Sequence, residues 1–283
     1  MTEQRIDQRI APTTLIAILV SMTAALVFRA WLQMTLLQRG VAPQMAADLS
    51  YLVVPPTLMF FLLPIWRTER QFVAGQFRPA NLTGKLVIIG IAIGVMLRLL
   101  WWTQLVAGVS FGVYASDPQS AVGPTFAFGC PNIATMALGI LTTVLLTPVI
   151  EELIHRAYVI NALLPRGRSI AILGSAVVFA IFHRSGAWVF ACLAGVAFAW
   201  LYWCTRSLWL SLIAHATFNG LTLLDWRCVS GQWNPRAADI PLIETGITAL
   251  TIMLATVVAL VATLYRISTE ANNRPGNRFL KER

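Results

Sequence analysis

Charged residues are scarce in this sequence. Asp, Glu, Lys and Arg make up only 12% of the 283 residues, about half of the share that is usual in a soluble domain. Hydrophobic residues make up 57% and come in long runs, and a soluble core of this size could not cover so much apolar surface. The composition therefore argues against a soluble protein. It predicts an all-α, polytopic membrane helix bundle that forms a single integral membrane domain over residues 1–283.

The sequence also lacks the motifs of several other protein classes. The four cysteines contain no CxxC pair, which argues against cysteine-ligated zinc. Nothing resembles a nucleic-acid-binding motif, although the net charge is +9. We therefore expect no nucleic-acid partner and assign the basic residues to membrane topology and to lipid headgroups of the bilayer. The first apolar run is too long for the hydrophobic part of a secretory signal peptide, so we interpret it as the first span.

Eight apolar runs predict about eight transmembrane helices, because a spanning helix needs about 20 apolar residues. The runs cover residues 13–37, 50–66, 84–108, 132–164, 168–185, 187–204, 207–225 and 242–266. Pro55 and Pro56 fall in the second run, which predicts a broken or kinked helix there.

The basic residues between the runs predict the orientation of the chain. With the N-terminus in the cytoplasm, the cytoplasmic segments hold fourteen Lys and Arg residues and the outer segments hold four. Cytoplasmic loops of membrane proteins carry this excess, so we expect both termini in the cytoplasm and, in a bacterium, a location in the plasma (inner) membrane. Cys130 and Cys228 fall in segments predicted to lie outside, where a disulfide between them is a hypothesis.

Ionisable residues inside the apolar runs are concentrated between residues 151 and 215. This region holds all three histidines of the chain and a pair of adjacent carboxylates, namely His155, His183, His215, Glu151 and Glu152. Because ionisable groups are costly inside a membrane, a functional role is the default hypothesis for them.

The spacing of these residues predicts shared helix faces. Glu152 and Arg156 are four residues apart and can form an ion pair along one helix. His215 and Asn219 have the same spacing and face the same way. Glu151 projects about 100° away from Glu152, so the two carboxylates need not share a role.

Three of the predicted helices bring polar groups to a similar depth. At about 1.5 Å per residue, Glu151, His183 and Asn219 lie about 20 Å from the cytoplasmic ends of their runs. A site that is built from side chains of several helices requires that these side chains lie at a similar depth in the membrane.

The protease motifs HExxH, GxSG and GxGD are absent, which disfavours a zincin-type, serine or aspartyl site and leaves carboxylate and imidazole chemistry.

Three motifs occur in order on successive predicted helices. Residues 151–156 read EExxxR, residues 179–183 read FxxxH and residues 215–219 read HxxxN. In this order they resemble the prenyl-CAAX protease and bacteriocin-processing family, which includes the type II CAAX prenyl endopeptidases. Gly195 and the Ser-Leu-Trp sequence before the third motif also fit that family. The resemblance covers residues 132–225, which we interpret as the core that carries the site.

The resemblance implies an intramembrane endopeptidase whose site opens towards the cytoplasm. It implies that Glu151 activates the attacking water with help from His183, and that His215 and Asn219 stabilise the oxyanion. It also implies a supporting ion pair, formed by Glu152 and Arg156. Peptide hydrolysis does need a base for water and donors for the developing oxyanion, and carboxylate, imidazole and amide groups can supply them.

Several alternatives stay open at this point. The favoured mechanism needs no cofactor, but Glu151, His183 and His215 could instead hold Zn²⁺ in a metal-dependent version of the protease. A non-catalytic membrane scaffold or immunity protein and a proton-coupled transporter are the rival functions. The expected partner of the protease is a membrane-anchored or lipidated protein or peptide.

At position 155 the family commonly has an aromatic or aliphatic residue, whereas this chain has a histidine. We expect the His155 ring to face a neighbouring helix and to bond a backbone carbonyl. The alternative is a third imidazole in the site.

Overall fold

A computed structural model describes residues 10–77, 82–112, 133–183, 187–223 and 243–272. These residues are almost entirely helical, and no strand occurs among them. The structure therefore confirms the predicted all-α helix bundle. Cys130 and Cys228 lie outside the described residues.

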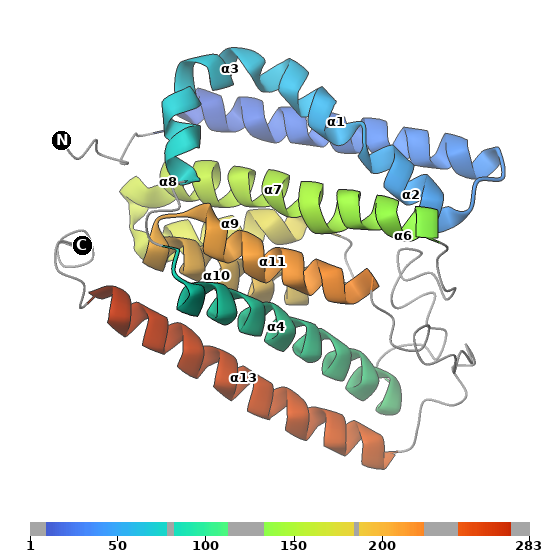
Figure 1. The fold of residues 1–283 in the computed structure, drawn as a ribbon, viewed down its shortest axis with the longest axis vertical. Coiled ribbons are helices and arrows are strands. Elements are labelled where there is room, and N and C mark those ends of the chain that lie inside the picture. The colour runs from blue at the N-terminus through green and yellow to red at the C-terminus, as the bar shows by residue number, and fades with distance from the viewer. Residues whose placement is uncertain (1–9, 78–81, 113–132, 184–186, 224–242, 273–283) are drawn as a thin grey trace.

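The described elements are mostly long helices that pack side by side in a bundle (Figure 1). The first part consists of α1 (Pro12–Gln38), α2 (Pro43–Tyr51), α3 (Val54–Gln76) and α4 (Gly84–Ser110). A continuous helical rod follows, made of α6 (Ile133–Gly139), η2 (Ile140–Leu146), α7 (Thr147–Glu152), η3 (Leu153–Ile160), α8 (Asn161–Leu163) and η4 (Leu164–Arg166). The last elements are α9 (Arg168–Ile181), α10 (Trp188–Thr205), α11 (Leu208–Leu223) and α13 (Ile243–Asn272).

Among the described residues, six stretches are long and apolar enough to cross a bilayer, fewer than the eight predicted runs. They are Thr13–Gln38, Met45–Ile65, Gly84–Gly108, Met136–Arg166, Trp188–Thr205 and Gly246–Glu270. The two remaining runs form α9, which has 14 helical residues and is shorter than a full span of about 20, and α11, of which 16 helical residues are described. The run predicted for α9 extends beyond Ile181, where the helix ends, so hydropathy alone overestimates the length of this helix.

The predicted break in the second apolar run is confirmed. α2 ends at Tyr51 and α3 begins at Val54, with a proline in its first turn. A proline is tolerated there because the first N–H groups of a helix have no partner within that helix.

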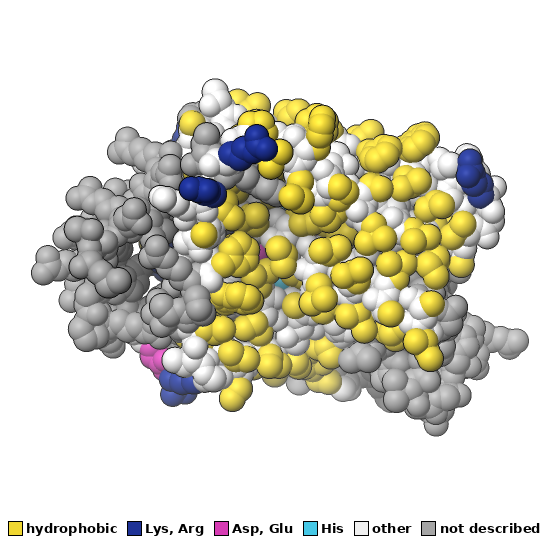
Figure 2. Space-filling view, turned by 45° about the horizontal axis from the view of Figure 1, so that its top comes forward, with side chains coloured by type: hydrophobic (Ala, Val, Ile, Leu, Met, Phe, Trp, Pro, Cys, Tyr) yellow, Lys and Arg dark blue, Asp and Glu magenta, His cyan; other side chains and the backbone are white. Residues whose placement is uncertain are grey.

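The surface has the polarity of a membrane protein. In Figure 2, hydrophobic side chains cover the middle of one face, and Lys and Arg side chains lie towards its ends. Large exposed side chains such as Phe60, Ile88 and Val258 belong to the apolar surface, which would be unfavourable in water and is favourable in lipid. The chain is an integral membrane protein. α1 begins and α13 ends at the same end of the bundle (Figure 1), and which end faces the cytoplasm stays a prediction.

Glycines allow the helices around the site to approach closely. A Cβ atom at Gly94 of α4 would lie 2.5 Å from the backbone oxygen of Ala214 in α11, and one at Gly90 would lie 3.0 Å from α11 side chains. The GxxxG spacing puts both glycines on one face of α4. Gly195 likewise allows α10 to pack closely on α9, because its Cβ would lie 3.0 Å from the Cα of Ala176.

Gly94→Ala should destabilise the protein by about 1–3 kcal/mol, because the added methyl group meets backbone that cannot move cheaply. Thermal unfolding in detergent, followed by tryptophan fluorescence, would show a lowered Tm. Gly75→Ala in α3 is the matched control, since its Cβ meets nothing within 4 Å and alanine favours the helix. Equal Tm values for the two variants would contradict the close crossing of α4 and α11.

Candidate active site

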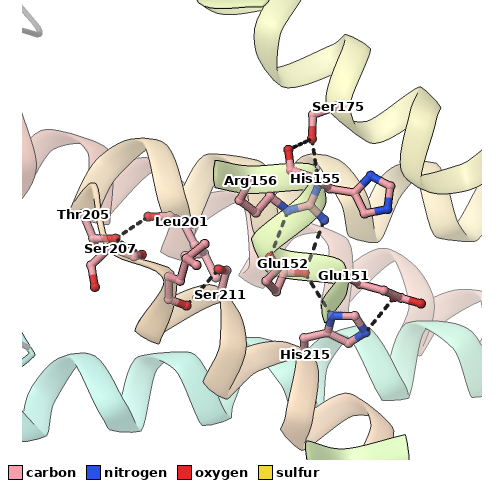
Figure 3. Close-up of polar contacts among 11 residues, drawn as sticks. Glu151, Glu152, His155, Arg156, Ser175, Leu201, Thr205, Ser207, Ser211 and His215 are labelled. Carbon is pink, nitrogen blue, oxygen red and sulfur yellow. Dashed lines mark hydrogen bonds and ion pairs between the residues drawn. The ribbon is translucent and has the colours of Figure 1, made fainter. Parts of the chain in front are cut away.

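The predicted ion pair between Glu152 and Arg156 lies deep in the bundle (Figure 3). Both side chains are 0% exposed, and Nε of Arg156 donates to Oε2 of Glu152 at 2.9 Å. Nη1 of Arg156 donates to Oγ of Ser175 at 2.9 Å, and that hydroxyl donates to the backbone oxygen of His155 at 2.8 Å. These bonds compensate the positive charge of Arg156, whose burial without a partner would cost much free energy.

Two phenylalanine rings enclose the guanidinium of Arg156. Its central carbon lies 5.0 Å from the ring centroid of Phe179 and 5.8 Å from that of Phe198. A guanidinium within about 6 Å of an aromatic face is attracted by the ring quadrupole. Because the rings come from α9 and α10, Arg156 joins both helices to η3.

His215 of α11 bridges the two carboxylates. Its Nδ1 donates to Oε1 of Glu152 at 2.9 Å, and its Nε2 lies 3.7 Å from Oε2 of Glu151. A carboxylate can only accept, so Nδ1 carries the proton in this bond. The imidazole also stacks on Phe198, with 4.8 Å between ring centroids. Its orientation is therefore fixed by a hydrogen bond and by packing.

These contacts define the charge balance of the cluster. Glu151 and Glu152 supply two carboxylates, and Arg156 supplies one permanent positive charge. One further proton makes the group neutral, which a low-dielectric interior favours. The proton can reside on Glu151 or on Nε2 of His215, because these groups face each other. The geometry therefore provides a pair that can take up and release a proton.

Glu151 is the more accessible of the two carboxylates. Its side chain is 16% exposed, against 0% for Glu152. Its Oε2 has no hydrogen-bond partner among the described residues. The two neighbouring glutamates thus have different environments, which agrees with the prediction that they need not share a role.

His183 lies beside this cluster, and a hydrogen bond to the backbone orients its ring. It follows the C-terminal end of α9, and its Nδ1 lies 2.8 Å from the backbone oxygen of Phe179. A carbonyl accepts, so Nδ1 carries the proton and Nε2 of the neutral ring is left as an acceptor. Within the described part of the chain, no direct hydrogen bond joins His183 to Glu151.

Asn219 donates a hydrogen bond to a backbone oxygen in a π-helical segment of the neighbouring helix. Its Nδ2 donates to the backbone oxygen of Thr143 at 2.8 Å. Thr143 lies in η2, a π-helical segment in which the N–H of Thr147 bonds the oxygen of Thr142, five residues back. The next bond in this register would run from residue 148 to Thr143, but Pro148 has no N–H. The proline therefore leaves open the carbonyl that Asn219 bonds.

A single ring connects the three histidines. The ring centroid of Phe179 lies 5.2 Å from that of His155, 4.5 Å from that of His183 and 5.8 Å from that of His215. Sequence reasoning assigned no separate role to this phenylalanine or to Ser175. Ser175 lies four residues before Phe179 and eight before His183, so a lone serine on the same face of an apolar helix was the available signal.

His155 differs from the prediction. Its side chain is fully buried, but neither ring nitrogen bonds a backbone carbonyl or has any hydrogen-bond partner among the described residues. The predicted backbone bond is wrong. η3 is π-helical from Leu153 to Ile160, so the offset between residues four apart differs from that of the α-helix on which the prediction rested.

The geometry gives no support to a metalloprotease-like site. In the described ranges, no group of three or more His, Cys, Asp and Glu side chains is placed to hold a metal ion. The alternative zinc set of Glu151, His183 and His215 is therefore not gathered into such a group.

Comparison with known protein families gives one finding for this part of the chain. Residues 132–221 match the family described as type II CAAX prenyl endopeptidase Rce1-like. The match covers less than half of the chain and contains all three motifs. No curated protein and no solved structure matches the chain. The resemblance predicted from the motifs is thus confirmed for residues 132–221, the segment that carries the candidate active site and matches the Rce1-like family.

Proposed function

We propose that the protein is an intramembrane endopeptidase that hydrolyses a peptide bond of a membrane-anchored or lipidated protein or peptide. The observation that carries the proposal is the series of contacts from Glu151 through His215 and Glu152 to Arg156. In this series, an accessible carboxylate faces an imidazole that is held by a second, charge-compensated carboxylate. The match of residues 132–221 supports the reaction class.

In the first step, Glu151 acts as the general base. Its carboxylate takes a proton from a water molecule while the water oxygen attacks the carbonyl carbon of the peptide bond. The C–O bond that forms pushes the carbonyl electron pair onto oxygen. Nε2 of His183 can accept the second proton of the water in a hydrogen bond, because its Nδ1 already bonds Phe179.

His215 and Asn219 stabilise the oxyanion. The bond from Nδ1 of His215 to Glu152 leaves Nε2 facing the site. Nε2 can donate to the oxyanion when it carries the additional proton of the cluster, which leaves Glu151 as the carboxylate that acts as the base. The amide of Asn219 has two N–H groups, and its bond to Thr143 fixes the amide so that the other N–H can donate to the oxyanion. Donors that are oriented in advance contribute most in such a low-dielectric site.

The last step returns the proton. Glu151 protonates the leaving nitrogen, the C–N bond breaks, and the products are a carboxyl group and an amine. Glu152 and Arg156 keep their charges throughout and hold His215 in place. Every step is assigned to a side chain of the protein, so the proposed mechanism needs no metal ion.

The surroundings of Glu151 favour a substrate that arrives from the lipid. Leu145 and Val149 precede Glu151 on the same helical rod, and both are exposed hydrophobic side chains that belong to the apolar face of the protein. A lipid anchor or a membrane-embedded segment can pack on that face, which brings a neighbouring peptide bond close to the carboxylate.

Glu151→Gln should lower cleavage of membrane-anchored peptides by about a thousandfold, because the amide cannot take the proton from water. The assay uses detergent-purified protein, a panel of membrane-anchored peptides and mass spectrometry of the products, with and without a chelator. Glu270→Gln is the matched control. Glu270 is a surface residue that pairs with Lys85 at 2.9 Å, far along the chain from the site, and the substitution should leave cleavage unchanged.

The outcomes separate the proposal from its rivals. Loss of cleavage on adding a chelator, with recovery on adding zinc, would replace the proposal with the metal-dependent mechanism. Equal cleavage by the wild type and Glu151→Gln would exclude Glu151 as the base. Proton-coupled transport in vesicles without any cleavage would favour the transporter.

Pro148→Ala should lower kcat about tenfold, because its new N–H competes with Asn219 for the oxygen of Thr143 and loosens one oxyanion donor. KM should change little, since substrate binding does not depend on this donor. Pro165→Ala, in the exposed turn after α8, is the control and should retain wild-type kcat. Wild-type kcat in Pro148→Ala would contradict the role given to this carbonyl.

A further inference from the structure

His155 is the buried polar side chain whose contacts the proposed mechanism does not explain. Its residue exposure is 0%, and both ring nitrogens lack a hydrogen-bond partner among the described residues. The neighbouring side chains differ in this respect, since Glu152, Arg156 and His215 are all hydrogen-bonded. A polar atom that is buried without a partner costs free energy, so a buried imidazole in this position calls for a ligand.

Packing alone does not require an imidazole at this position. The ring meets Phe179 edge-on at 5.2 Å and lies 6.0 Å from Phe182. A phenyl ring can make the same aromatic contacts, and it has no polar atoms to satisfy. The two nitrogens of His155 must therefore be explained by something other than these rings.

The nitrogens belong to the same polar region as the catalytic carboxylate. Figure 3 shows the ring of His155 and the carboxylate of Glu151 on the same side of the helix. Oε2 of Glu151 also lacks a hydrogen-bond partner among the described residues. The ring of His155 also contacts Phe179, whose ring contacts both His183 and His215.

A water molecule has the chemistry that these groups require. A neutral imidazole offers one donor and one acceptor, and a carboxylate offers acceptors only. Water can donate to the carboxylate while it exchanges a second hydrogen bond with the imidazole, and buried waters typically make about three such bonds.

We propose that His155 is a further positioning residue of the site, and that its imidazole and Oε2 of Glu151 together bind a water molecule inside the membrane-spanning part of the protein. The inference rests on the proposed function for its kinetic consequence only. The binding of water at His155 is a separate physical statement, and it can be tested without a substrate.

The kinetic test compares His155→Phe with His155→Asn. The phenyl ring keeps the contacts to Phe179 and Phe182 but removes both nitrogens, so kcat should fall about tenfold, as expected for one lost hydrogen bond in the site, while KM stays within about twofold. Asparagine restores a donor and an acceptor and should recover most of the lost kcat. A purely structural role would give the opposite order, with the aromatic variant closer to the wild type.

The accessibility test measures water directly. His155→Cys and Ala157→Cys are made in a background in which Cys130, Cys192, Cys204 and Cys228 are replaced by alanine. Ala157 is equally buried in η3 and belongs to the hydrophobic core, so it is the matched control. A small charged methanethiosulfonate reagent reacts with thiolates, which need water to form. It should modify His155→Cys at least tenfold faster than Ala157→Cys.

The two tests fail in different ways. Equal modification rates for His155→Cys and Ala157→Cys would overturn the inference, whatever the activity of the protein. The same holds if His155→Phe retains wild-type kcat. Faster modification of His155→Cys in a protein that cleaves none of the peptides would uphold the water site and count against the proposed protease.

Discussion

The ion pair between Glu152 and Arg156 is the interaction on which the rest of the site depends. A guanidinium that is 0% exposed among apolar helices would be strongly destabilising without its partners. Because Arg156 compensates its charge, Glu152 can accept a hydrogen bond from His215 without leaving a net negative charge in the bundle. That bond fixes the imidazole that faces Glu151. Without Arg156, the two glutamates would compete for the same proton, and their different roles would be lost.

The backbone around this pair is irregular where the site needs it. π-Helical turns are uncommon and often occur at functional sites, and here η2 and η3 lie on either side of the short α7 that carries both glutamates. Pro148 interrupts the register and leaves a carbonyl for Asn219. Gly94 lets α11 approach α4 closely enough to present His215 and Asn219 to that segment. Helix irregularity and small residues thus position the donors together.

The sequence predicted those parts of the site that follow from the spacing of residues along a helix and from the free-energy cost of burying ionisable groups. An ionisable residue in an apolar run has few low-energy arrangements, so Glu152 and Arg156 at a spacing of four predicted the ion pair that is seen. The helix ends could not be predicted, because hydropathy does not locate them, and the apolar run predicted for α9 is therefore longer than the helix. The environment of His155 could not be predicted either. The environment of this ring depends on a π-helical turn, and a sequence pattern based on 3.6 residues per turn does not reveal such a turn.

The difference between the two glutamates arises from their partners. Glu152 has its oxygens engaged by Arg156 and His215, whereas Glu151 has one ion-pair contact at 3.7 Å and an oxygen without a hydrogen bond among the described residues. Together with the ring of His155, the site has more hydrogen-bonding capacity than the described protein groups satisfy. In a low-dielectric interior such unsatisfied capacity is destabilising. Water or a substrate peptide that satisfies it would therefore stabilise the fold as well as take part in hydrolysis, so that the reaction and the stability of the bundle depend on the same groups.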